Sequence, residues 1–159
     1  MTDPMEALRH LQFALTAREV ELQPCELYPE IKVLLDHPND IARFTYALLD
    51  GSKVQAVALF AMAAPIEGLT CFNIGYAVAE QLRGKGIASS LLERAIKEMA
   101  HGFSRTPMKA FYIEAIVSTL NEPSNRIAGK LVSATREEGT DAFSGEPIYQ
   151  YVRKVECAA

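Results

Sequence analysis

Tryptophan is absent from the 159 residues, and cysteine occurs only as Cys25, Cys71 and Cys157. This odd number, without a C-x-x-C spacing, indicates neither a disulfide framework nor a zinc site, and we expect no metal. No stretch approaches the roughly 20 apolar residues of a membrane span. Residues 1–6 carry acid where a secretory signal has basic residues. From these absences we expect neither membrane insertion nor secretion, and we expect a cytoplasmic protein.

Basic clusters are also lacking. The net charge is −4, with no run of lysine or arginine that could neutralise a phosphate backbone, so we expect no nucleic-acid partner. Apolar residues make up 49% and charged residues 23%, as in ordinary globular proteins. A chain of this length forms one domain with a sizeable core, so residues 1–159 are predicted to be a single domain.

The order of hydrophobic patterns predicts a mixed chain of strands and helices. The first forty residues are interpreted as helix and loop, because apolar residues there recur at helical spacing. These are Leu8, Leu11 and Leu15, then Ile31, Leu34 and Leu35. A hairpin follows, with Asp50-Gly51 between two apolar runs, since glycine readily takes the positive φ of a tight turn. The later elements are a strand over 71–78, a helix over 87–99, a strand over 110–117, a helix from 121–123 and a strand over 148–152.

The helix over 87–99 is predicted from two opposite stripes. Its apolar stripe consists of Ile87, Leu91, Leu92, Ala95, Ile96 and Met99. The other stripe, expected to face solvent, consists of Ser90, Glu93, Arg94, Lys97 and Glu98. Gly102 and Pro107 are expected to end this helix.

Between the strand and this helix lies a glycine loop, residues 83–88. Gly84 and Gly86 remove side chains, so that backbone N–H groups can approach an anion at the positive end of the helix. Arg83 and Lys85 add positive charge, and Ser89 adds a hydroxyl in the first turn. The loop therefore predicts a pyrophosphate site. An ordinary strand-to-helix turn is an equally good interpretation of the loop by itself.

Two other phosphate-binding motifs were compared with the loop. A P-loop requires glycine at position 79, where this chain has alanine. A dinucleotide fingerprint requires a third glycine where Ser89 stands, and it follows parallel βαβ units instead of hairpins. A nucleotide-binding domain using the same loop stays an alternative.

Two further motifs stand in order with the glycine loop. Ile74-Gly75-Tyr76-Ala77-Val78 precedes the loop, and Glu114-Ala115-Ile116-Val117 is followed by Asn121-Glu122-Pro123-Ser124. Together the three motifs resemble the GNAT N-acetyltransferase superfamily, especially its ribosomal-protein N-terminal acetyltransferases, whose coenzyme A pattern, Arg/Gln-x-x-Gly-x-Gly/Ala, residues 83–88 fit. The resemblance implies an α+β fold: a mixed, mostly antiparallel sheet of six to seven strands with helices on both faces.

The resemblance also implies how acetyl-CoA binds. Tyr76, Ala77 and Val78 would pair through their backbone with the pantetheine arm, as an added strand does. The implied pyrophosphate site comprises Arg83, Gly84, Lys85, Gly86, Ile87, Ala88 and Ser89. Asn121 matches an asparagine that contacts the arm, although an asparagine before a helix is as often a cap.

The implied activity is acetyl transfer to a primary amine, a peptide N-terminus or a small molecule, by direct attack on the thioester. Glu114 is the candidate base; alternatively it is a strand carboxylate that faces solvent or pairs with arginine. Ser124 is the candidate acid, because relatives use a helix tyrosine where this chain has Ala128; alternatively Ser124 only caps the helix.

Besides Ala128, the part of the chain that would carry the catalytic residues departs from the family pattern at the end of this helix. Leu131-Val132-Ser133 stands where relatives close the helix with Leu-Gly-Phe, so the helix is expected to extend towards Arg136. A catalytically degenerate acyl-CoA sensor therefore stays an alternative to the enzyme. Relatives often form dimers, which leaves a homodimer open.

Overall fold

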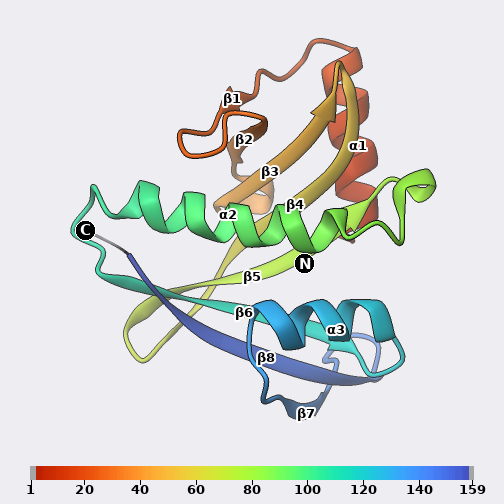
Figure 1. Ribbon diagram of the computed structural model, residues 1–159. Coiled ribbons are helices and arrows are strands. Elements are labelled where there is room, and N and C mark those ends of the chain that lie inside the picture. Colours follow the sequence, from red (N-terminus) through yellow and green to blue (C-terminus); the bar gives the residue numbers. More distant parts are fainter. Residues whose placement is uncertain (1–2, 158–159) are drawn as a thin grey trace.

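A twisted sheet of eight strands runs through the molecule in the order β1-β2-β3-β4-β5-β6-β8-β7 (Figure 1). The computed structural model describes residues 3–157. The strands are β1 (Gln23–Pro24), β2 (Ile31–Asp36), β3 (Arg43–Asp50), β4 (Lys53–Ile66), β5 (Leu69–Val78), β6 (Ala110–Ser118), β7 (Glu137–Thr140) and β8 (Pro147–Glu156). The helices are α1 (Pro4–Thr16), α2 (Ile87–Phe103) and α3 (Glu122–Leu131), with 3-10 turns at Pro38–Asp40 and Glu80–Leu82.

Neighbouring strands pair antiparallel everywhere except between β5 and β6, which are parallel. The predicted fold class, a mostly antiparallel mixed sheet between helices, is confirmed. The sheet has eight strands where six to seven were expected; one of the eight, β1, is only two residues long. Residues 1–2 of the acidic N-terminal segment lie outside the described residues.

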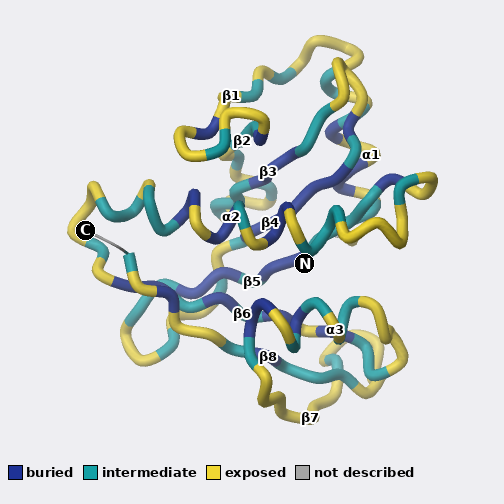
Figure 2. The backbone as a smooth tube through the Cα atoms, viewed as in Figure 1, coloured by how far each residue is buried: buried dark blue, intermediate teal, exposed yellow. Residues whose placement is uncertain are grey.

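Helices cover both faces of the sheet, and the alternation along β4 decides which side chains meet them. Ala56, Ala58 and Phe60 belong to the larger core under α2 and α3. Val57 and Leu59 point the other way, into a smaller core with Leu8 and Leu11 of α1. Both faces of the central strands are therefore buried, as Figure 2 shows by their dark colour.

The first forty residues contain a strand that was not predicted. Helix α1 is present, with Asp3 as its N-cap and Pro4 in its first turn. The segment from Ile31 to Asp36, however, is β2, paired antiparallel with β3 along its whole length. The helical interpretation of Ile31, Leu34 and Leu35 is wrong, because so short an apolar run suits either structure and strand pairing decides it.

The hairpin at Asp50-Gly51 is confirmed. Asp50 pairs with Lys53 across a two-residue loop, in which Gly51 has φ +61°. The strands over 71–78 and 110–117 are confirmed as β5 and β6, and the closing strand as β8.

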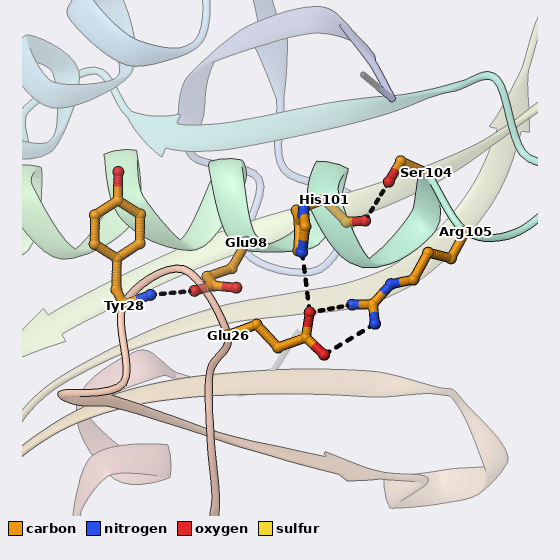
Figure 3. Close-up of polar contacts among 6 residues, drawn as sticks. All are labelled: Glu26, Tyr28, Glu98, His101, Ser104 and Arg105. Atoms are coloured by element: carbon orange, nitrogen blue, oxygen red, sulfur yellow. Dashed lines mark hydrogen bonds and ion pairs between the residues drawn. The ribbon is translucent and has the colours of Figure 1, made fainter. Parts of the chain in front are cut away.

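Helix α2 is confirmed, but two details differ from prediction. It continues to Phe103, so Gly102 lies inside its last turn. Glu98, expected to face solvent, is buried, because the segment between β1 and β2 packs against this side of α2. Its carboxylate accepts a hydrogen bond of 2.6 Å from the N–H of Tyr28 (Figure 3).

A second contact with the same segment, from the last turn of α2 and the residues just after it, is exposed. Glu26 receives two hydrogen bonds from Arg105 and lies 3.0 Å from Nε2 of His101 (Figure 3). These partners, Arg105 foremost, hold the pKa of Glu26 below its usual value. Together with the Glu98 contact, they fix the segment before β2 to the C-terminal half of α2 and to the turn that follows it.

Helix α3 ends at Leu131, so the expected extension towards Arg136 is wrong. The N–H groups of Val132 and Ser133 both bond to the carbonyl of Ala128, which closes the last turn without a glycine. The chain then enters β7, which was not predicted and whose four residues are all exposed. None of the helices within residues 3–157 is long and apolar enough to span a membrane.

Candidate active site

The central feature of the site is the divergence of β5 and β6. Only three residue pairs join these strands, and the last is Asn73 with Glu114. Beyond it, β5 stays paired with β4 as far as Val78, and β6 stays paired with β8 as far as Ser118. The two halves of the sheet therefore separate, and the facing edges of Ile74–Val78 and Ala115–Ser118 have no partner strand within residues 3–157 (Figure 1).

A cleft of about 810 Å³ occupies this opening. It extends from the diverging strands to the glycine loop and the first turn of α2, and the first turn of α3 forms another wall. All the predicted coenzyme residues line it except Lys85. Of the two candidate catalytic residues, Ser124 lines it and Glu114 does not.

The glycine loop has the conformation that an anion site needs. Gly86 is the N-cap of α2 and has no side-chain cap, so the N–H groups of the first turn are free of intrahelical partners. With the helix dipole, they form a site for negative charge at the end of the cleft. Arg83 and Arg126 line the cleft as well, whereas Asp3 is the one acidic residue among the described lining residues.

The two glycines also have a backbone conformation that other residues rarely adopt. Gly84 and Gly86 have φ values of +78° and +75°, which side chains of L-residues rarely adopt. A Cβ at either position would meet nothing within 4 Å. Glycine is therefore explained at both positions by the left-handed backbone, because no neighbouring protein atom requires it.

The start of α1 also belongs to the site, which the sequence patterns did not predict. Asp3, Pro4 and Met5 line the cleft, and Nη2 of Arg83 lies 3.9 Å from Sδ of Met5. Asp3 followed by proline is a recognisable helix start. Its place opposite the glycine loop depends on the topology of the whole sheet and could not be read locally.

Tyr76 and Asn121 connect the strand and helix walls of the cleft. The hydroxyl of Tyr76 donates to the carbonyl of Ser124 across 2.8 Å, a side-chain role the sequence did not reveal. Burial raises the pKa of Tyr76 to about 12, so its phenol stays protonated at neutral pH. Asn121 caps α3 by accepting from the N–H of Ser124, as its alternative interpretation predicted, and it also lines the cleft.

Glu114 lies next to the inner end of the cleft, on the opposite face of the sheet from α2 and α3. Its neighbours Ile113 and Ala115 point into the core under those helices, so Glu114 points away from it. Its Oε2 accepts a hydrogen bond from Nε2 of Gln150 on β8. Its partner is thus an amide, and neither an arginine nor solvent alone.

Cys71, on the same face, is buried, and this burial with the nearby Glu114 raises its pKa to about 11. A thiol with such a pKa is protonated and a poor nucleophile at neutral pH. Within residues 3–157, no three His, Cys, Asp or Glu side chains gather as metal ligands.

Comparison with known families identifies the chain. The profile of the acetyltransferase (GNAT) family matches residues 6–130. The chain belongs to this family. The predicted family of N-acetyltransferases is thereby confirmed. No curated protein sequence matches the GNAT chain significantly.

Solved structures share the GNAT fold at low identity. The ribosomal-protein-S5-alanine acetyltransferase of Vibrio fischeri is 16% identical, with a TM-score of 0.56, over 72% of this chain and 62% of its own. A GNAT acetyltransferase of Streptococcus pneumoniae is 13% identical, with a TM-score of 0.52, over 97% and 96% of the two chains. RimJ of Mycobacterium smegmatis, in complex with CoA-disulfide, is 17% identical, with a TM-score of 0.52, over 71% and 53%.

Proposed function

We propose that this protein is an acetyl-CoA-dependent N-acetyltransferase that transfers the acetyl group to a primary amine. The observation that carries the proposal is the cleft between β5 and β6, which joins a free strand edge to an uncapped helix N-terminus. Acetyl-CoA has matching parts: an amide-bearing arm for the strand edge and a pyrophosphate for the helix. Family membership supports the same assignment.

The residues present fit this co-substrate. The first-turn N–H groups of α2 and the guanidinium of Arg83 would hold the pyrophosphate, with Arg126 as a second cation. The free backbone groups of Tyr76, Ala77 and Val78 would pair with the pantetheine amides. From Val78 to Asn73 the strand rises by roughly 17 Å. The arm would thus lead towards the inner end of the cleft.

The proposed transfer is direct attack by the amine nitrogen on the thioester carbon. The protonated state of Cys71 supports direct attack over an acetylated cysteine intermediate. Glu114 is the proposed proton acceptor on one face of the sheet. Ser124, which lines the cleft on the other face, is the proposed proton donor to the departing thiolate.

The acceptor is proposed to be a peptide N-terminus or a small-molecule amine. An α-amine with a pKa of about 7.7–8.0 is roughly one quarter neutral near pH 7.4, whereas a lysine amine is about one part in a thousand neutral. An α-amine is therefore often neutral before it attacks, and the base is needed for the proton that the nitrogen loses as the amide forms.

Release of free thiol from acetyl-CoA, measured with a panel of amines, tests the proposal. The panel contains peptides beginning with alanine, serine or methionine, together with spermidine and lysine. We expect thiol release that depends on one class of amine and equals the amide formed. Binding of CoA without thiol release for any amine would favour the acyl-CoA sensor instead. Binding of NAD in place of CoA would favour a nucleotide-binding domain.

A cytoplasmic location, one domain over residues 1–159 and a homodimer are further parts of the proposal. Sedimentation of the purified chain at several concentrations tests the dimer.

A further inference from the structure

Asn73 lies at the point where β5 and β6 separate. It forms the last register pair with Glu114, and the residues that follow the pair, Ile74 and Ala115, both line the cleft. The pair therefore adjoins the inner end of the cleft. Neighbouring strands are about 4.8 Å apart and paired residues point the same way, so the two side chains are adjacent.

Both side chains point to the face of the sheet opposite α2 and α3, because Phe72, Ile74 and Ala115 point into the core under those helices. On this face, two residues beyond Glu114, Ile116 is 49% exposed. Ile116 also lines the cleft, so the cleft reaches this face of the sheet two residues beyond Glu114, and an acceptor can approach the pair from there.

Asn73 has an unused hydrogen-bonding group. Its Oδ1 is the one buried side-chain oxygen or nitrogen within residues 3–157 that has no hydrogen-bond partner. Such an atom is destabilising, and native proteins keep few of them. Because no hydrogen bond restrains it, the amide can turn towards an arriving N–H without losing one.

Glu114 is held differently. Gln150 donates to its Oε2, while Oε1 accepts nothing from the described residues. The carboxylate is thus oriented by one bond and keeps one free acceptor. The pair offers two acceptor oxygens, one amide and one carboxylate, beside the place where the thioester would lie.

We propose that Asn73 and Glu114 together bind the nitrogen of the acceptor amine and select primary amines. Oδ1 of Asn73 accepts the N–H that the amide product keeps, and Oε1 of Glu114 accepts the N–H that is lost. This assignment rests on the proposed function. It adds a binding residue, Asn73, and a physical basis for excluding secondary amines.

The lone pair of the amine forms the C–N bond, and the C–S bond breaks with its electron pair on sulfur. One proton passes from nitrogen to the Glu114 carboxylate, and the thiolate takes one proton from the Ser124 hydroxyl or from water. A neutral primary amine has two N–H groups, one for each acceptor. A secondary amine has one, and it places carbon against Asn73.

The test compares a primary amine with its N-methyl derivative in the thiol-release assay. The probes are an alanyl peptide and its N-methylalanyl counterpart, or the corresponding pair for the best primary amine of the panel. The variants are Asn73→Ala and the near-isosteric Asn73→Leu. The control is Cys71→Ala, on the same face of β5 two residues earlier. CoA affinity and circular dichroism are measured for each.

We expect kcat/KM for the primary amine to fall about 10- to 100-fold in both Asn73 variants, as for a hydrogen bond to a nitrogen that becomes charged. For the N-methyl amine, kcat/KM should change less than about twofold, and so should the affinity for CoA. Cys71→Ala should have the same kcat/KM values as the wild type. Equal losses of kcat/KM for both amines, or no loss for the primary amine, would overturn the role of Asn73 without touching the proposed function. Failure of the wild type to acetylate any amine would overturn the proposed function and this assignment with it.

Discussion

Replacing Gly86 by glutamate perturbs the proposed pyrophosphate site most selectively. Gly86 is in the left-handed region, with φ +75°, and a side chain there would meet no atom within 4 Å of its Cβ. The steric cost is therefore conformational only, about 1–2 kcal/mol for a residue other than glycine. The negative charge acts separately. At about 6 Å and an effective dielectric constant of about 20, each phosphate charge repels it by roughly 3 kcal/mol.

The matched control is Gly86→Gln, which has the same size and strain without the charge. We expect both variants to lower the free energy of unfolding by about 1–2 kcal/mol in urea. In titration calorimetry, Gly86→Gln should weaken CoA binding modestly, and Gly86→Glu should weaken it at least about 100-fold further. Raising the salt concentration should narrow that gap. Equal CoA affinities of the two variants at low salt would refute the placement of the pyrophosphate.

Three further predictions concern other parts of the site and fold. Glu114→Gln should lower kcat by about 100-fold or more without changing CoA affinity, and an unchanged rate would remove Glu114 from proton transfer. Tyr76→Phe should lower the free energy of unfolding by about 1 kcal/mol, because the carbonyl of Ser124 loses its donor. The pKa of Glu26 in the folded protein is below the ordinary 4.5. Its ionised carboxylate therefore adds to the free energy of unfolding above pH 4.5, and this contribution is lost as the pH falls through the lower, folded-state pKa. Urea unfolding of Glu26→Gln and wild type should therefore differ at pH 7 and converge in acid; a difference that persists in acid would contradict the sign.

The elements that sequence predicted correctly are those specified by neighbouring residues. Asp50-Gly51 sets a hairpin, the apolar stripe of α2 recurs within one helix, and the glycine loop marks a strand-to-helix turn. Residues 31–36 were assigned wrongly because their short apolar run suits a helix or a strand. Pairing with β3, which lies later in the chain, decides the outcome.

In the candidate site, too, only the features specified by neighbouring residues were predicted. The sequence predicted coenzyme-binding residues in a contiguous motif, and all of that motif except Lys85 lines the cleft. That coenzyme A binds there stays a prediction. The sequence could not predict that Asp3 and Met5 close the cleft from α1, or that Tyr76 reaches the carbonyl of Ser124. Nor could it reveal the burial of Glu98, which depends on Tyr28, seventy residues away in the chain. Such contacts arise from topology and not from local pattern.

Amide hydrogen exchange with and without CoA tests whether coenzyme A binds between β5 and β6. If the co-substrate lies between the diverging strands, the N–H groups of residues 84–89 and 75–78 should exchange more slowly when CoA is bound. The segment before β2, held to the far end of α2 by Glu98, should exchange at the same rate with and without CoA. Protection elsewhere, with exchange in β5 and the glycine loop unchanged, would contradict the account.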